Sequence, residues 1–121
     1  PIVSGGQRHY KIQQARVEVM KNENSIEMYR QNLKMQEIQA QNEWLGAMQK
    51  LELQKANIAL AGKIYQNALT KEKIGSESSI IVTQKYNQLI QAQTQFVGAK
   101  IEVFNAKLKL EKLYNQILTT K

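Results

Sequence analysis

The titratable residues of this chain are not grouped as catalysis or metal binding requires. His9 is the only histidine, and Glu18 follows nine residues later, a spacing that does not bring two ligands to one face of a helix. Glu23 and Glu27 stand four residues apart and could face each other, but the Glu-x-x-His partner of two-metal helical bundles is absent. We therefore interpret His9 as a surface residue and the glutamates as solvated charges.

The composition excludes several further classes of site. The 121 residues include no cysteine and no aspartate, and all ten acidic residues are glutamate. Disulfides, thiolate metal sites, cysteine nucleophiles and Asp-based triads are excluded, as are most loop-type calcium sites. No Gly-rich phosphate loop or nucleophile elbow occurs. We predict a chain that is not an enzyme and takes no cofactor.

The net charge of +7 raises the question of nucleic acid or an anionic membrane as a partner. The Lys and Arg residues are spread along the chain among many Gln and Asn, with no aromatic and basic cluster. Phosphate binding needs a basic stripe, so we interpret the charge as a solvated helical surface and expect no nucleic acid. No stretch approaches the ~20 apolar residues of a membrane-spanning helix. Because the chain opens on Pro1, we interpret it as a piece of a larger protein.

The pattern predicts two long helices joined by one turn. A helical pattern over 8–74 ends at the only glycine with turn chemistry around it, in the segment 75–78, and a second helical pattern covers 79–119. The opening residues 1–7 are short, β-leaning and Gly-terminated, so they resemble the end of a strand and a linker. The predicted class is all-α, a long antiparallel α-helical hairpin with coiled-coil-like packing.

The second helix carries the clearest periodicity. An apolar row recurs every seven residues, at Val82, Leu89, Phe96, Val103, Leu110 and Ile117. Further rows hold Ile90, Val97, Phe104 and Leu118, and Ala92, Ala99, Ala106 and Leu113. A sustained seven-residue repeat predicts left-handed coiled-coil packing. Because the apolar surface is wider than the seam of a simple dimer, we expect neighbours on two sides, as in a bundle or a closed ring of helices.

The first helix is less regular and longer. Its expected seam near the turn is Trp44, Met48, Leu51, Ile58, Tyr65 and Leu69, with Lys55 and Gly62 in the gaps. At 1.5 Å per residue the two helices would run about 100 Å and about 60 Å, which leaves residues 8–31 without a partner in the chain. We expect other segments or protomers to cover them. Three isolated glycines are interpreted as places where a neighbouring helix comes close: Gly46, Gly62 and Gly98.

Residues on both sides of the turn resemble the TolC-like outer-membrane efflux protein family. Its pattern runs A-x-x-x-Y, then G-x-x-S/T in the turn, then L-x-x-A, and is matched by Ala61 and Tyr65, Gly75 and Ser78, and Leu89 and Ala92. The opening residues 1–7 are similar to the family's P-[IL]-F-x-G-G, where an outer-membrane strand gives way to a long periplasmic helix. The resemblance covers essentially the whole chain.

The resemblance implies a function and a place. Such proteins are homotrimers with a β-barrel in the outer membrane of a Gram-negative bacterium, continued by an α-helical tunnel through the periplasm. This chain would be the second periplasmic hairpin of the tandem repeat, a fragment of the trimeric α-barrel. At its tip a periplasmic adaptor (membrane-fusion) protein would dock, and an inner-membrane pump would supply the energy. The implied docking residues are Glu72, Ile74, Gly75, Ser76, Glu77 and Ser78.

The sequence departs from the family pattern at the tip. Ile81 stands where the family has Asp, so a capping box with Ser78 cannot form. Glu72 and Glu77 occupy positions where closing contacts of the family involve an aromatic and a basic residue, so those contacts do not carry over. Two alternatives stay open. One is the hairpin of a membrane-fusion adaptor, although its Arg-Leu-Ser-type tip motif is absent from 70–80; the other is a generic structural coiled coil.

Overall fold

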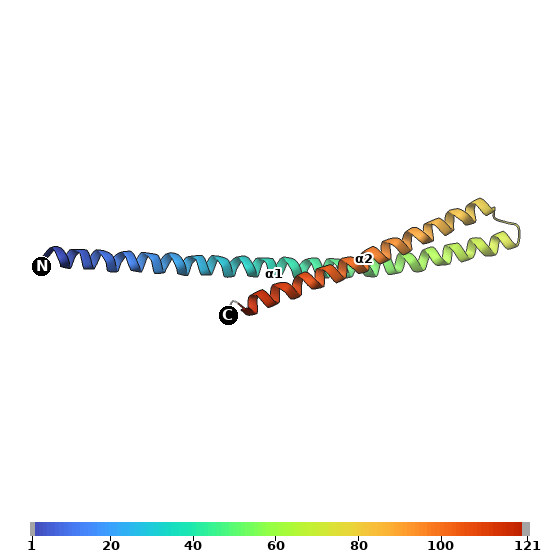
Figure 1. The fold of residues 1–121 in the computed structure, drawn as a ribbon. Coiled ribbons are helices and arrows are strands. Elements are labelled where there is room, and N and C mark those ends of the chain that lie inside the picture. The colour runs from blue at the N-terminus through green and yellow to red at the C-terminus, as the bar shows by residue number, and fades with distance from the viewer. Residues whose placement is uncertain (1, 120–121) are drawn as a thin grey trace. The chain divides into compact units, whose positions relative to one another are not determined.

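The structure, a computed structural model, describes the backbone of residues 2–119 and the side chains of 5–119. It contains two helices, α1 (Ile2–Lys73, 72 residues) and α2 (Ser79–Thr119, 41 residues), and no strand within the described residues (Figure 1). The all-α class and the bounds of the second helix are confirmed. The first helix ends at Lys73, one residue earlier than expected.

The start of α1 differs from the prediction. Residues 2–7, expected to be the end of a strand and a linker, are helical, and Pro1 lies outside the described residues. A strand satisfies its backbone N–H and C=O groups only through a neighbouring strand, whereas a helix bonds them within itself. With no strand in the described chain to pair with, the helix is the conformation that satisfies this segment.

The chain divides into two units, Pro1–Ile38 and Gln39–Lys121. In the first unit every residue from Gly5 to Asn32 is exposed. The apolar residues Ile12, Val19 and Ile26 therefore face solvent, although they recur every seven residues. Within residues 2–119, no helical stretch is apolar enough over a sufficient length to cross a membrane.

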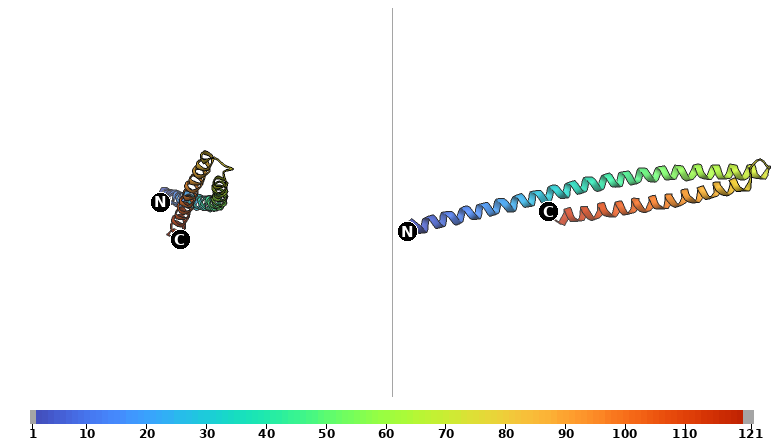
Figure 2. Two further views of the ribbon diagram at one scale, coloured as in Figure 1. Left: turned by 90° about the vertical axis from the view of Figure 1, so that its right-hand side faces the viewer. Right: turned by 90° about the horizontal axis from the view of Figure 1, so that it is seen from above.

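The second unit is an antiparallel hairpin. Figure 1 shows α2 crossing α1, and the view from above in Figure 2 shows it running alongside, as two helices that wind around each other. Lys109 Nζ lies 3.0 Å from Glu43 Oε2, and Lys50 Nζ lies 3.0 Å from Glu102 Oε1. The two ion pairs are seven residues apart on both helices, so one antiparallel register holds across the hairpin.

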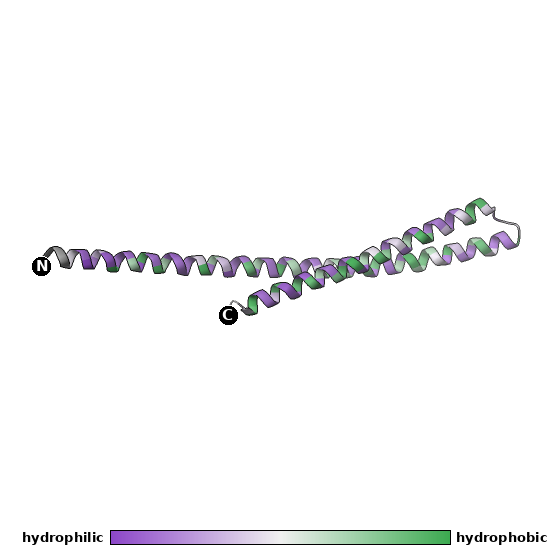
Figure 3. Ribbon diagram, in the orientation of Figure 1, coloured by the Kyte–Doolittle hydropathy of each residue, from purple (hydrophilic) through white to green (hydrophobic). Residues whose placement is uncertain are grey.

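The buried face of α2 consists of two of the three predicted rows. Figure 3 shows apolar and polar residues alternating along both helices. Buried and half-buried residues recur in steps of three and four, at Val82, Lys85, Leu89, Ala92, Phe96, Ala99, Val103, Ala106, Leu110, Leu113 and Ile117. This is the spacing of a coiled-coil seam. The row of Ile90, Val97, Phe104 and Leu118 stays exposed in the described chain.

The seam of α1 corrects the prediction for the first helix. Buried and half-buried residues recur with the same spacing, at Ala40, Trp44, Ala47, Leu51, Gln54, Ile58, Ala61, Tyr65 and Ala68, and Gly62 and Leu69 beside them are half-buried. Met48 and Lys55, which were expected in the seam, are exposed. Each of them directly follows a seam residue, so one of the two predicted rows is shifted by one position and consists mainly of alanines, whereas the predicted row of Trp44, Leu51, Ile58 and Tyr65 is confirmed. A small row lets two helices approach closely without a gap.

Side chains of both helices form the core of the hairpin. Ala40 packs in one cluster with Leu110 and Leu113, and Trp44 covers it. The Trp44 indole N–H is buried there without an acceptor in the described chain. Ala40 is 1% exposed. The larger side chains of Leu110 and Leu113 fill the space beside this small residue, so little volume remains for a larger side chain on α1.

We expect Ala99→Leu to lower the free energy of unfolding by about 1–3 kcal/mol, because Ala99 is 1% exposed and added methyl groups would force α1 and α2 apart. Urea unfolding followed by circular dichroism measures this. The control is Ala56→Leu, the same change at an exposed position of α1, which should leave stability within about 0.5 kcal/mol. Equal effects of the two changes would contradict the seam.

Candidate docking site at the hairpin tip

The end of α1 is closed by a backbone motif that requires glycine. The N–H of Gly75 donates to the carbonyl of Glu72 at 3.0 Å, and the N–H of Ser76 donates to the carbonyl of Lys71 at 2.9 Å. This pair of bonds is the Schellman motif, in which the residue after the helix adopts a left-handed conformation. Gly75 has φ of 79° and is the one described residue with positive φ. The predicted turn former is confirmed.

The start of α2 is capped by a side chain. Ser78 Oγ accepts a hydrogen bond from the N–H of Ile81 at 3.4 Å, and the Ser78 carbonyl accepts the N–H of Val82 at 3.3 Å. These are the bonds of an N-cap residue, so the predicted cap is confirmed. Ile81 is half-buried and contributes packing where an acidic residue would have completed a capping box.

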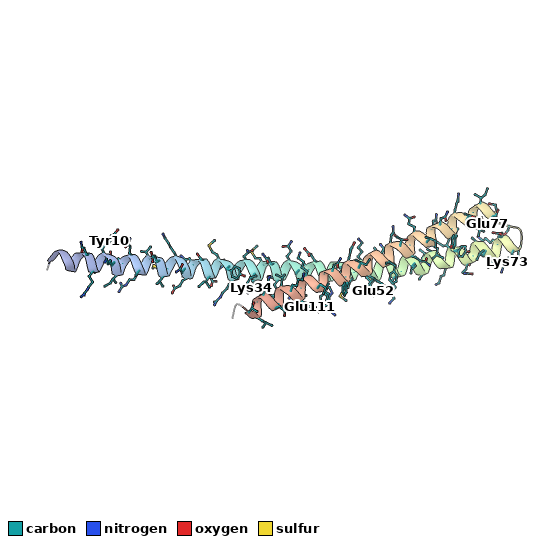
Figure 4. The ribbon with its side chains drawn as sticks, viewed as in Figure 1. Tyr10, Lys34, Glu52, Lys73, Glu77 and Glu111 are labelled. Atoms are coloured by element: carbon teal, nitrogen blue, oxygen red, sulfur yellow. The ribbon has the colours of Figure 1, made fainter. Side chains whose placement is uncertain are left out.

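The surface of the tip combines one apolar side chain with charges of both signs. Ile74 is 75% exposed and Glu72 is exposed, while Glu77 is half-buried. Figure 4 shows Lys73 and Glu77 at the same end of the hairpin, one on each side of the turn. Neither belongs to either of the two ion pairs found in the described chain. The tip therefore presents an apolar residue and unpaired charges on a fixed turn, which suits docking of another protein.

Ser76 adds a second bond to the turn. Its Oγ donates to the Lys71 carbonyl at 3.2 Å, the same oxygen that accepts the Ser76 N–H. Lys71 and Lys73 lie in the last turn of α1, where positive charge is stabilised by the helix dipole. The Ser76 bonds hold the backbone of the turn, and the side chains of Glu72 and Ile74 are exposed beside it.

The residues considered for metal binding are not brought together. His9 is exposed and lies 3.4 Å from the Gln13 amide nitrogen, and Glu18, Glu23 and Glu27 are exposed along the same helix. The described residues contain no group of three or more His, Cys, Asp or Glu side chains that could hold a metal ion. The glycines interpreted as close-approach sites are also corrected, because a Cβ at Gly46, Gly62 or Gly98 would meet nothing within 4 Å.

Sequence reasoning missed part of an exposed apolar face on α2. Ile101 and Leu108 extend the exposed row into a second stripe with heptad spacing, here called the back stripe: Ile90, Val97, Ile101, Phe104 and Leu108. Its members are between 39 and 62% exposed. The signal was in the sequence, because Ile101 and Leu108 each follow a member of the predicted row by four residues.

The chain was also compared with known proteins. No family model matches it, and neither the curated proteins nor the solved structures contain a match.

Gly75→Ala should lower the free energy of unfolding by about 1–2 kcal/mol, because an L-residue with a Cβ is strained at this φ. The strain is conformational, since the space around Gly75 is open. The matched control is Gly46→Ala in the interior of α1, where the same added methyl should raise stability by about 0.5–1 kcal/mol. Thermal and urea unfolding measure both, and a stabilising Gly75→Ala would contradict the turn geometry.

Ser78→Ala removes the side-chain acceptor for the Ile81 N–H, and we expect a loss of about 0.5–1 kcal/mol in unfolding free energy. Ser79→Ala, one residue inside α2, serves as the control because Ser79 Oγ makes no capping bond in the described structure. Hydrogen exchange of the first turn of α2 should accelerate only in the Ser78 variant. Identical exchange in the two variants would show that Ser78 is not the cap.

Proposed function

We propose that this chain is a non-catalytic wall segment of a TolC-like outer-membrane export channel, and that its hairpin tip docks a periplasmic adaptor protein. The observation that carries the proposal is the tip itself, where the capped turn holds Ile74 exposed between unpaired charges. The docking surface comprises Glu72, Ile74, Gly75, Ser76, Glu77 and Ser78. In this role the hairpin carries out no chemistry, and an inner-membrane pump supplies the energy.

Two further features support a place in a helical wall. α2 buries one heptad face against α1 and keeps the back stripe exposed on another face. Residues 5–32 carry apolar side chains with heptad spacing and no burial. A helix with exposed apolar faces is marginal in water without further packing. Both surfaces suit a homotrimer in which neighbouring helices complete a ring in the periplasm of a Gram-negative bacterium.

A second candidate function is a hairpin of a membrane-fusion adaptor or a generic structural coiled coil. The antiparallel seam of α1 and α2 favours it, because such a hairpin also serves as a spacer or an assembly element. The two candidates differ in where they are sensitive to mutation. A spacer depends on the seam along its length, whereas an export channel also depends on the exposed residues of the tip.

In cells that carry the full-length protein, Gly75→Leu and Ile74→Glu should abolish most of the export of a fluorescent efflux substrate, and crosslinking of the tip to an adaptor should be lost. The first change distorts the turn and the second places a charge on its exposed apolar residue. The control is Lys63→Ala, an exposed change on α1 away from the turn. The amount of protein in the outer membrane is measured for each variant. Unchanged export with normal amounts of the tip variants would count against the proposal.

A further inference from the structure

The back stripe faces away from the hairpin seam. Ile101 lies two residues from both Ala99 and Val103, and a step of two residues turns about 200° around a helix. Phe104 lies two residues before Ala106 and is 62% exposed, although it is one of the two phenylalanines of the chain. The steps of four and three from Val97 to Leu108 match the seam on the other face. A face with this spacing fits another α-helix in coiled-coil packing.

The flanks of the hairpin seam show which positions carry ion pairs. Glu43 and Lys50 each directly precede a large seam residue of α1, and Glu102 and Lys109 do the same on α2. At these positions each lysine meets a glutamate at 3.0 Å across the seam. The hairpin therefore shows that, beside an antiparallel heptad interface, the residue directly before a large seam residue is placed to form an ion pair with the other helix.

The back stripe has lysines at the equivalent positions. Lys100 directly precedes Ile101, and Lys107 directly precedes Leu108. Lys112 lies on the opposite flank. None of the three belongs to an ion pair in the described part of the chain, and Lys100 Nζ instead lies 4.4 Å from the centre of the Phe96 ring. Along the span of the back stripe these lysines are the flanking charges, and Glu111, exposed seven residues after Phe104, ends the apolar row.

A second copy of α2 would bring like charges together on this surface. An antiparallel copy that matched Ile101 with Phe104 would place Lys100 beside Lys107 of the other copy. A parallel copy in register would place Lys107 beside Lys112 of the other copy. Like charges beside a heptad interface are unfavourable. The charge pattern therefore argues against pairing of two back stripes.

We propose that the back stripe binds a different helix, an amphipathic α-helix with a heptad apolar stripe and glutamate or aspartate at the flanking positions that face Lys100 and Lys107. This inference rests on the proposed wall function and deepens it, because it names the chemistry of the helix beside α2. Apolar burial supplies the attraction, and the carboxylates select the partner and its register.

The test uses the whole 121-residue chain and two synthetic four-heptad helical peptides with the same apolar stripe. One carries glutamate at the flanking positions and the other carries lysine. Fluorescence anisotropy should show the acidic peptide binding about tenfold tighter at low salt, with the difference shrinking at high salt. The double variant Lys100→Glu/Lys107→Glu should reverse the preference. Phe104→Glu should abolish binding of both peptides, whereas Leu60→Glu, at an exposed leucine of α1, should not.

Several results would overturn the inference. Equal binding of the two peptides would show that the lysines do not select the partner. Binding of neither peptide would show that the back stripe does not bind a helix. A dimer that is lost on Phe104→Glu in sedimentation would assign the stripe to a second copy. Binding to anionic phospholipid vesicles that depends on Phe104, in place of peptide binding, would assign it to a membrane surface. If the acidic peptide binds but export does not depend on the tip, the interface stands and the proposed export function falls.

Discussion

The burial of one heptad face of α2 against the 39–73 segment of α1 is the constraint on which the hairpin depends. A helix of 41 residues gains little from its own backbone bonds in water, so its stability comes from packing. The seam provides that packing through alanines on both helices and larger side chains between them. The two exposed ion pairs are consistent with its register, which the packing of the seam sets. Once the seam is set, the turn must lie at one end and the remaining faces must point outward.

The tip is built by a second, local set of interactions. The Schellman bonds at Gly75 and the cap at Ser78 satisfy backbone groups that the two helix ends would otherwise leave unpaired. They use backbone atoms and hydroxyl groups only. The side chains of Glu72 and Ile74 are consequently exposed and not needed to form the turn. A surface of this kind can differ between related proteins without loss of the fold, which is the property that a specific docking site requires.

Sequence periodicity predicted most of this fold, and its errors have physical causes. The bounds of α2, the turn at Gly75 and the cap at Ser78 follow from local chemistry and were confirmed. One of the two rows of the α1 seam was misassigned by one position, because a choice by hydrophobicity favours Met48 over Ala47, whereas close packing favours the alanine. The opening residues were misassigned because strand-forming residues need a partner strand. The proposed docking at the tip involves a second molecule, so no pattern within this chain determines it.

The exposed lysines beside the two apolar faces of the hairpin differ in whether they have a partner. Along the hairpin seam, two lysines are matched by glutamates of the other helix. Beside the back stripe, Lys100 and Lys107 occupy the same kind of position next to exposed apolar residues, without a carboxylate across from them in the described chain. Lysine stems add apolar surface to such a stripe while their ammonium groups stay in water. The unpaired ammonium groups of Lys100 and Lys107 therefore disfavour pairing of two back stripes and favour a helix with acidic flanking residues. In this way an exposed apolar face can still select its partner.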